Sequence, residues 1–206
     1  APVVDLEEQQ AVLRSRAASD SALVESAAAN FIAVFGQYQI MPVLKHFPGI
    51  GSLQSDLHNQ SASLTLKAED TAIFSHLLEQ YPNIGLMVTH VSLANKFNGQ
   101  ICSLSSDCLS AISSNFPQVL IFTDDLMMAS AREQAGSNQP AELGELAVQA
   151  VRAGNDILLF GPSASAADLE QVLTALETAY NDSQSFRERV DGSVAKILLL
   201  KKQPQN

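Results

Sequence analysis

The apolar residues of this chain follow two alternating patterns, short uninterrupted runs and longer stretches with helical spacing. The runs are apolar on both faces, which is typical of strands in a parallel sheet that helices cover. They predict strands at 1–6, 39–44, 84–88, 119–125 and 156–160. Helical spacing predicts helices at 20–35, 70–81, 105–114, 140–153, 165–180 and, in a last amphipathic stretch, 190–198. The chain is therefore predicted to alternate strand and helix from end to end.

Capping residues mark the limits of several predicted helices. Asp20 or Ser21 can accept hydrogen bonds from the first free amides of the helix that follows. Ser165 and Asp168 have the spacing of a capping box, and Gly154 stands where a helix stop is expected. Local sequence and hydrophobic pattern therefore agree on where these helices begin or end.

Strand and helix alternation of this kind predicts an α/β fold with a parallel sheet, either an open doubly wound sheet or a (β/α)8 barrel. A barrel gathers site residues from many strand ends at one face, whereas an open sheet concentrates its site behind a Gly-rich turn. No GxGxxG motif opens a helix here. Titratable residues close most of the predicted strands, namely Asp5, Lys45, His46, His90, Asp124 and Asp125. This distribution favours the barrel.

The predicted strands are too few to close an eight-stranded barrel. We therefore expect the chain to cover roughly the last five β/α units of a (β/α)8 TIM-barrel-type domain. All of 1–206 is expected to belong to that single domain, with further strands preceding Ala1.

Charge and hydropathy narrow the range of partners. The chain has 206 residues and a net charge of −10, whereas nucleic-acid backbones and anionic membranes favour Lys and Arg. Neither is therefore expected as a partner, and a neutral small molecule stays open. No apolar run approaches the roughly 18 residues of a membrane span, and the N-terminus has no basic region typical of a signal peptide. The acidic composition points to the cytoplasm, with a periplasmic or secreted location open if a signal peptide lies upstream.

The two cysteines, Cys102 and Cys108, do not have the CxxC spacing of a metal pair. Free thiols are the favoured interpretation, and a local disulfide stays open. No metal and no cofactor are expected.

The run 119–125 is the most informative strand, because it ends abruptly in two carboxylates, Asp124 and Asp125. In parallel α/β folds the C-terminal ends of strands are where sites are built. The alternative is that both aspartates only start a loop and cap the helix that follows.

Several segments spread along the chain form a set. They are Ala-Pro-Val-Val-Asp (1–5), Lys-His-Phe-Pro-Gly-x-Gly (45–51), Asp56-x-His58, Met-Val-Thr-His-Val (87–91), Ser-Leu-Ser (103–105), Thr-Asp-Asp-Leu-x-Met (123–128) and the stretch 150–159. In this order the set resembles glycoside hydrolase family 3, in particular its bacterial β-N-acetylglucosaminidase branch. The resemblance covers nearly the whole chain and leaves out the first third of the family's domain, which supplies three barrel strands.

The resemblance implies a retaining, two-step mechanism. Asp124, the first of the pair, would form a glycosyl-enzyme ester, and Asp125 would be supporting structure. This branch uses a histidine as general acid and base, held by an aspartate two residues earlier, and His58 with Asp56 fits that dyad. Without the surrounding motif, the same Asp-x-His would fit a solvated loop or half of a metal site.

The resemblance also implies substrate contacts. Lys45 and His46 would hold sugar hydroxyls, with a strand-end salt bridge as the alternative. Arg16 falls where the family has a substrate-contacting arginine. His90 would line the floor of the barrel or, as the alternative, fill the core as a satisfied histidine. Met128 would pack near the nucleophile.

The chain departs from the family pattern at three places. Ala17 stands where an aromatic residue usually follows the arginine, Ile50 where a histidine is common, and Ser52-Leu53 where Asp-Thr is common. The last two lie in the loop that leads to the dyad, so they bear on loop geometry and substrate preference.

The resemblance leaves three functions open. The leading one is a retaining exo-β-N-acetylglucosaminidase that removes terminal N-acetylglucosamine from peptidoglycan fragments or chitooligosaccharides. The second is a β-N-acetylglucosaminide phosphorylase, because a histidine acid/base leaves room for anionic phosphate where a carboxylate would repel it. The third is a catalytically silent sugar-binding or scaffold protein of the same fold.

Overall fold

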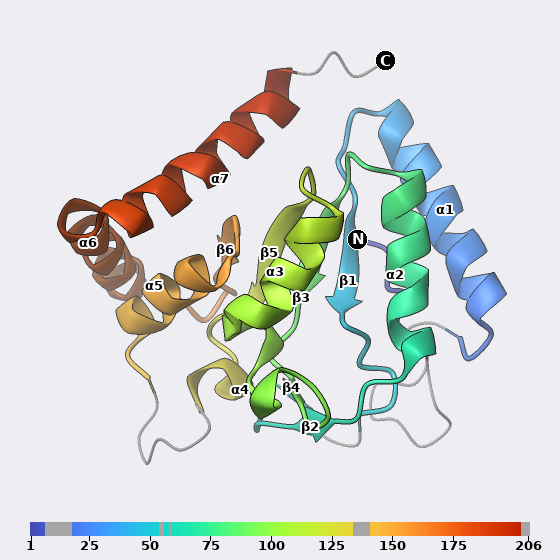
Figure 1. The fold of residues 1–206 in the computed structure, drawn as a ribbon, viewed down its shortest axis with the longest axis horizontal. Helices are drawn as coiled ribbons and strands as arrows, with labels where there is room; N and C mark the ends of the chain where they lie inside the picture. Colours follow the sequence, from blue (N-terminus) through green and yellow to red (C-terminus); the bar gives the residue numbers. More distant parts are fainter. Residues whose placement is uncertain (7–17, 54–55, 58, 134–140, 203–206) are drawn as a thin grey trace.

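The computed structural model describes residues 1–6, 18–53, 56–57, 59–133 and 141–202 (Figure 1). Their central element is a four-stranded parallel sheet in the order β1-β3-β5-β6. The strands are β1 (Val43–Phe47), β3 (Gly85–Val88), β5 (Leu120–Asp125) and β6 (Ile157–Leu159). The predicted strand at 1–6 is reduced to a parallel bridge between Val3 and Lys45 of β1. Within this sheet, each strand lies beside the strand of the same sheet that comes next in the sequence. This is the order of β/α barrel units.

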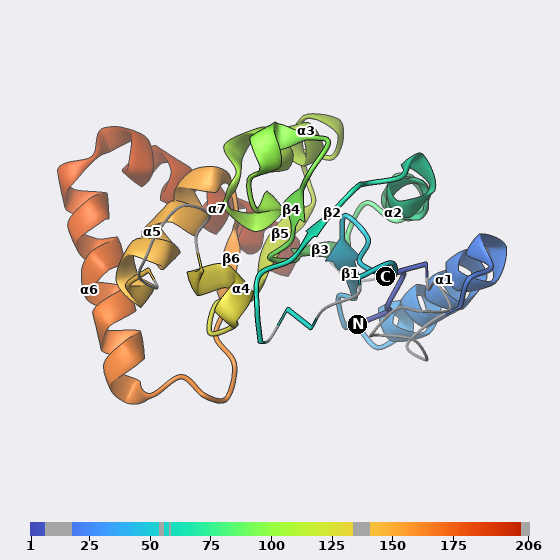
Figure 2. The ribbon, with the colours of Figure 1, turned by 90° about the horizontal axis from the view of Figure 1, so that it is seen from below.

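Helices flank this sheet in two groups. Figures 1 and 2 show α1 and α2 together on the side of β1, α5, α6 and α7 on the side of β6, and α3 between the groups. Their bounds are α1 Ser21–Gln37, α2 Ala68–Gln80, α3 Ser106–Asn115, α4 Ala129–Arg132, α5 Leu143–Ala153, α6 Ala166–Asp182 and α7 Gln184–Lys202. Within the described ranges, no helix has both the length and the apolar character needed to cross a membrane.

Short elements that the hydrophobic pattern does not predict lie near the ends at which the strands finish (Figure 1). β2 (Ser63–Leu64) pairs in parallel with β4 (Ser92–Leu93). Two 3-10 turns follow, η1 (Phe97–Gly99) and η2 (Cys102–Leu104). Elements of two or three residues are too short to show a hydrophobic period, so sequence reasoning missed them.

The second predicted strand is displaced along the chain. It was expected at 39–44, whereas β1 spans Val43–Phe47. The reason is that the turn ending α1 extends further than its apolar pattern suggests, because the amide of Gln39 still bonds to the carbonyl of Gly36 and Gln39 has a φ of 59°. A residue in this left-handed conformation cannot continue a strand. Lys45 and His46 therefore lie within β1 and not after it.

The predicted helix caps are largely confirmed. The Asp20 carboxylate accepts hydrogen bonds from the first amides of α1, and Ser165 and Asp168 form the capping box of α6. Gly154 ends α5 with a φ of 129°. The helix predicted at 70–81 begins earlier, at Ala68, and the Asp70 carboxylate accepts the amide of Lys67 from inside its first turn.

The prediction that the cysteines are free thiols is wrong. Cys102 and Cys108 form a disulfide that joins η2 to the first turn of α3. Both cysteines are also buried in the main apolar cluster, together with Leu109 and Ile112 of α3. The disulfide therefore fixes the entry of α3 against the core by a covalent bond.

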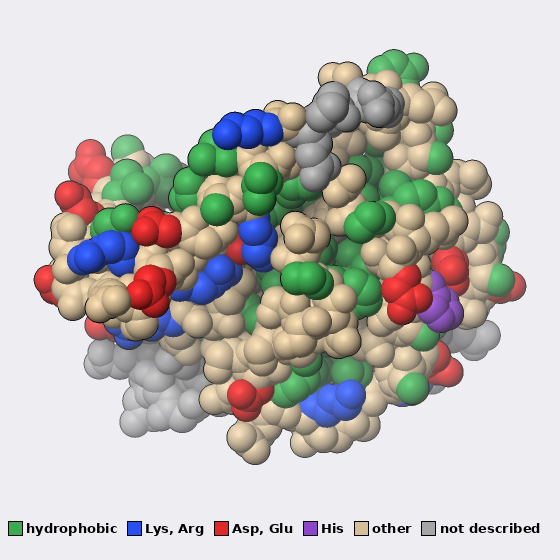
Figure 3. Space-filling model, turned by 45° about the horizontal axis from the view of Figure 1, so that its top comes forward, with side chains coloured by type: hydrophobic (Ala, Val, Ile, Leu, Met, Phe, Trp, Pro, Cys, Tyr) green, Lys and Arg blue, Asp and Glu red, His purple; other side chains and the backbone are tan. Residues whose placement is uncertain are grey.

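An apolar hollow of about 700 Å³ lies at the ends where the strands begin. Figure 3 brings this side forward and shows hydrophobic side chains gathered over it. Its lining includes Ile32 of α1, Ile84 before β3, Ile157 of β6 and Ile197 of α7. The hollow therefore lies at the amino ends of the strands. The titratable residues, where the chemistry is expected, lie at the opposite, carboxyl ends.

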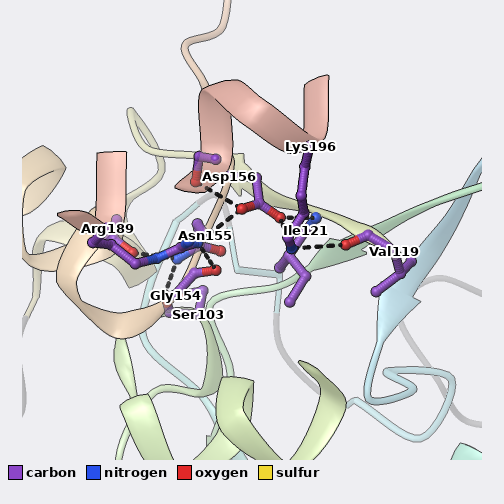
Figure 4. A network of polar contacts seen from close by, with 10 residues as sticks. Ser103, Val119, Ile121, Gly154, Asn155, Asp156, Arg189 and Lys196 are labelled. Carbon is purple, nitrogen blue, oxygen red and sulfur yellow. Dashed lines mark hydrogen bonds and ion pairs between the residues drawn. The ribbon is translucent and has the colours of Figure 1, made fainter. Parts of the chain in front are cut away.

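One buried carboxylate attaches α7 to the sheet (Figure 4). Asp156 precedes β6, and its side chain has no exposed surface. It accepts hydrogen bonds from Arg189 at 2.8 Å, Lys196 at 2.8 Å, Ser193 at 2.7 Å and the amide of Ile121 at 3.1 Å. Burial alone raises the pKa of Asp156, but the bonds from Lys196, Ser193 and Arg189 outweigh it and hold the pKa below the ordinary value of an aspartate.

Asp156→Asn should lower the free energy of unfolding by about 3–5 kcal/mol, because breaking a buried ion pair leaves its partners uncompensated. Urea denaturation at pH 7 measures this change. In the unchanged chain the carboxylate titrates lower when folded than when unfolded, so its stabilisation is present above about pH 4. It should be lost as the pH falls through the lowered folded-state pKa.

Glu170 provides the control, because it is an exposed carboxylate within α6. Glu170→Gln should change the free energy of unfolding by no more than about 0.5 kcal/mol. An Asp156→Asn variant as stable as Glu170→Gln would contradict the ion-pair argument.

Candidate active site

The polar ends of the strands meet at one edge of the sheet. β1 carries Lys45 and His46, Thr89 follows β3, and β5 ends at Asp125. The register pairs Val88 with Thr123, which places the residues that follow them side by side. The amide of Thr89 also bonds to the carbonyl of Phe47 at 3.0 Å. Parallel pairing therefore joins the ends of three strands in one site.

The Asp124 carboxylate is held at both oxygens. Thr89 donates its hydroxyl to Oδ2 at 3.0 Å, and the amide of Asp125 donates to Oδ1 at 2.9 Å. Asp124 is half-buried. Within the described part of the chain, each carboxylate oxygen thus has one donor, and the two donors fix the orientation of the group. A carboxylate oriented in this way could attack an electrophilic carbon.

The neighbouring carboxylate has a different environment. Asp125 Oδ1 accepts the amides of Met127 at 2.9 Å and Gly161 at 2.7 Å. A Cβ atom at Gly161 would overlap the Asp125 carboxylate, so the loop after β6 needs glycine to approach this closely. Asp125 therefore connects the end of β5 to the loop after β6. The helix that follows, α4, has Met128 at its N-cap, so neither aspartate caps it.

An aspartate to which sequence reasoning gave no role organises His46. Asp5 is 3% exposed, and its Oδ2 lies 2.8 Å from His46 Nδ1. Its carboxylate also accepts the amides of His46 at 3.2 Å and Ile50 at 3.0 Å. A carboxylate can only accept, so Nδ1 of His46 carries the proton in this contact. Asp5 was visible as a strand-end acid, but its partner depends on strand pairing that the sequence does not reveal.

The remaining residues of the resemblance are placed in part. Lys45 is half-buried, and its backbone bonds to Pro2 and Val4. Asp56 is half-buried, and the next residue, Leu57, accepts the amide of Ser130 at 3.3 Å, beside the segment that follows Asp124. His58 and Arg16 lie outside the described residues. The roles predicted for all of them stay predictions.

An apolar cluster joins the two loops that carry the candidate groups. Met128, 5% exposed, packs there with Leu57 of the dyad loop. Ile50 and Leu53, two of the residues that depart from the family pattern, belong to the same cluster and are 3% exposed. Apolar side chains at these two positions are therefore part of the packing between the loops.

His90 is a buried residue of this edge. The residue is 1% exposed, with Nδ1 2.7 Å from the Ser103 hydroxyl and Nε2 3.1 Å from the carbonyl oxygen of Asp125. Burial lowers its pKa, and the negative charge of Asp124 opposes that effect only in part. The placement agrees with the alternative of a satisfied core histidine, and contact with substrate stays a prediction.

Within the described ranges, no group of three or more His, Cys, Asp or Glu side chains is placed to hold a metal ion.

Comparison with known protein families shows to which family the chain belongs. The family described as "Glycosyl hydrolase family 3 N terminal domain" matches residues 1–200. The chain belongs to glycosyl hydrolase family 3. The match confirms the resemblance read from the motifs and, together with the sheet order, the predicted TIM-barrel-type fold, of which this chain covers a part.

Individual relatives of this family 3 chain agree with the branch. Beta-hexosaminidase LpqI of Mycobacterium tuberculosis is 27% identical over 215 residues, covering 98% of this chain and 53% of that protein. The solved structure of M. tuberculosis LpqI matches with a TM-score of 0.83, over 100% of this chain and 62% of that one. A family 3 β-N-acetylglucosaminidase from Paenibacillus sp. matches with a TM-score of 0.82 at 26% identity, over 98% and 39% of the two chains. The chain thus spans about half the length of the curated relative.

Asp5→Asn should lower the free energy of unfolding by about 1–3 kcal/mol, because an amide group cannot accept all the hydrogen bonds that the carboxylate accepts and a buried donor is left unpaired. It should also shift the ¹⁵N signals of His46, whose ring proton loses its acceptor. Urea denaturation and ¹⁵N spectra of histidine-labelled protein measure the two effects.

The exposed His76 serves as an internal reference in those spectra, because it lies on α2, with its Nδ1 3.5 Å from Glu25 Oε2. Its signals should stay unchanged in Asp5→Asn. Unchanged His46 signals would show that Asp5 does not set the protonation of that ring.

Proposed function

We propose that this chain supplies the nucleophile and the acid/base loop of a retaining exo-β-N-acetylglucosaminidase. The observation that carries the proposal is the Asp124 carboxylate, fixed by Thr89 and by the amide of Asp125 at the carboxyl ends of the strands. Relatives named beta-hexosaminidase support the activity. The substrate would be a terminal β-linked N-acetylglucosamine of a peptidoglycan fragment or a chitooligosaccharide.

In the first step Asp124 attacks the anomeric carbon while His58 donates a proton to the departing glycosidic oxygen. The bond between the anomeric carbon and that oxygen breaks, and an ester to Asp124 forms. In the second step His58 removes a proton from water, the water oxygen bonds to the anomeric carbon, and the ester bond breaks. The sugar leaves with its original configuration because the carbon is inverted twice.

The dyad has a clear chemical purpose in this scheme. Asp56 would hold the His58 ring in one tautomer and stabilise its protonated form, so that the ring can donate a proton and then retrieve one near neutral pH. Lys45, His46 and Arg16 would bind the sugar hydroxyls. The bond to Asp5 supports this role for His46, because it directs the other ring nitrogen away from Asp5.

Incubation with a fluorinated N-acetylglucosamine donor that forms the ester but hydrolyses slowly should add one sugar to Asp124. Intact mass and peptide mapping measure the label. Asp124→Asn should take no label, because an amide cannot form the ester, whereas the wild type should take about one equivalent. A label on any residue other than Asp124, or none on the intact protein that contains this chain, would overturn the assignment and favour the silent sugar-binding protein.

His58→Ala should reduce turnover by about 10²–10⁴-fold on substrates with poor leaving groups and much less on activated aryl glycosides, because only the former need protonation. Steady-state rates on a series of leaving groups measure the difference. The control is His76→Ala, which removes an exposed histidine on α2 and should leave both rates unchanged.

Equal losses of His58→Ala on both substrate classes would contradict the acid/base role. The same assays carried out in phosphate buffer distinguish the phosphorylase, which would turn over faster there and release the sugar 1-phosphate.

A further inference from the structure

Two consecutive residues after β3 hold the end of β5 at two different points. Thr89 donates to the side chain of Asp124, as described above. His90 contacts the main chain one residue later, with Nε2 3.1 Å from the carbonyl oxygen of Asp125. That carbonyl also accepts the amide of Met128 at 3.0 Å. The peptide group that follows Asp125 is therefore held at its carbonyl oxygen by two donors, one residue after Asp124.

The partners of His90 determine where its proton lies. A carbonyl oxygen can only accept, so Nε2 must carry the hydrogen in its contact with Asp125. In a neutral ring Nδ1 is then an acceptor, and the Ser103 hydroxyl donates to it across 2.7 Å. Burial lowers the pKa of His90, which agrees with a neutral ring. The hydrogen-bond chain therefore runs in one direction, from Ser103 through His90 to Asp125.

Ser103 is itself held firmly. It is 0% exposed and lies in η2, next to the disulfide between Cys102 and Cys108. Its carbonyl accepts the side-chain amide of Asn155 at 2.7 Å, and Asn155 lies just before β6. The main chain of Ser103 is thus held by the disulfide of the adjacent Cys102 and by the hydrogen bond from Asn155. This fixes the position from which its hydroxyl faces His90.

We propose that His90 is a positioning residue for the nucleophile. As the neutral tautomer protonated at Nε2, it fixes the carbonyl of Asp125 and so the backbone that carries Asp124, and Ser103 keeps the ring in that orientation. The inference rests on the proposed function and deepens it, because it gives the buried histidine a role in placing the attacking oxygen and not in binding the sugar.

The effect of this contact on rate follows from geometry. A carboxylate nucleophile must reach the anomeric carbon along a defined line, and an error of about 1 Å in placing a reacting group can cost about 10²-fold in rate. If Nε2 lost its hydrogen, two lone pairs would face each other across 3.1 Å and the carbonyl would turn away. Because Asp124 acts in both the formation and the breakdown of the ester, both steps should slow, whatever the leaving group.

The first test reads the proton directly. ¹⁵N spectra of histidine-labelled protein at neutral pH should show one ring protonated at Nε2 only, and that signal should disappear in His90→Gln, which assigns it among the 4 histidines. A His90 ring protonated at Nδ1, or at both nitrogens, would overturn the inference. This measurement needs no turnover, so it is independent of the glycosidase activity.

The second test is kinetic. His90→Phe, which keeps a ring but removes both hydrogen bonds, should lower kcat by about 10- to 100-fold with KM little changed. The loss should be equal on activated and poor leaving groups, unlike the loss expected of His58→Ala. His90→Gln, whose side chain keeps an N–H donor, should recover part of the rate. Rates are taken per active site, counted by the fraction that the fluorinated donor labels.

Matched serine variants separate positioning from packing. Ser103→Ala removes only the hydroxyl that faces His90 and should lower kcat in the same direction as His90→Phe. Ser193→Ala removes a buried hydroxyl of α7 that bonds to Asp156, and it should leave kcat unchanged. Lower melting temperatures with an unchanged kcat per labelled site in His90→Phe and Ser103→Ala would overturn the proposal. If the wild type showed neither labelling nor turnover, the result would instead contradict the proposed glycosidase function, on which the role of His90 rests.

Discussion

The parallel pairing of β1, β3 and β5 is the constraint on which the candidate site depends. It aligns Val88 with Thr123, so the residues after β3 reach the end of β5. The contacts of Thr89 with Asp124 and of His90 with the Asp125 carbonyl are consequences of that register. A slip of one residue would turn every side chain to the other face and separate these partners. The chemistry therefore depends on backbone pairing before it depends on any side chain.

Buried carboxylates maintain this arrangement by accepting backbone amides from other elements. Asp5 accepts those of His46 and Ile50, and Asp156 accepts that of Ile121 together with the cations of α7. A carboxylate accepts hydrogen bonds in several directions, which suits it to the points where a strand ends and regular pairing stops. Acidic residues near the strand limits of this chain thus join neighbouring β/α units.

Much of the fold could be predicted from the sequence, because hydrophobic period and capping residues are local signals. The strands at 84–88 and 119–125 and the caps at Asp20 and Ser165 are of this kind. The position of β1 was wrong because the positive φ of Gln39 leaves no trace in the apolar pattern. The contact of Asp5 with His46 was missed because it joins residues 41 positions apart. The disulfide was misjudged because the spacing of Cys102 and Cys108 does not show that η2 folds back onto α3.

Two adjacent carboxylates end β5, and their surroundings differ in a way that bears on which of them suits the proposed role of nucleophile. Asp125 directs Oδ1 at two backbone amides, and Gly161 lies against its carboxylate so closely that a Cβ atom there would overlap it. Asp124 receives one donor on each oxygen from the described part of the chain, so its orientation is fixed while lone pairs remain. A nucleophile needs both properties together. The geometry thus favours Asp124 without reference to the family motif, and it assigns to Asp125 the support on which the position of Asp124 depends.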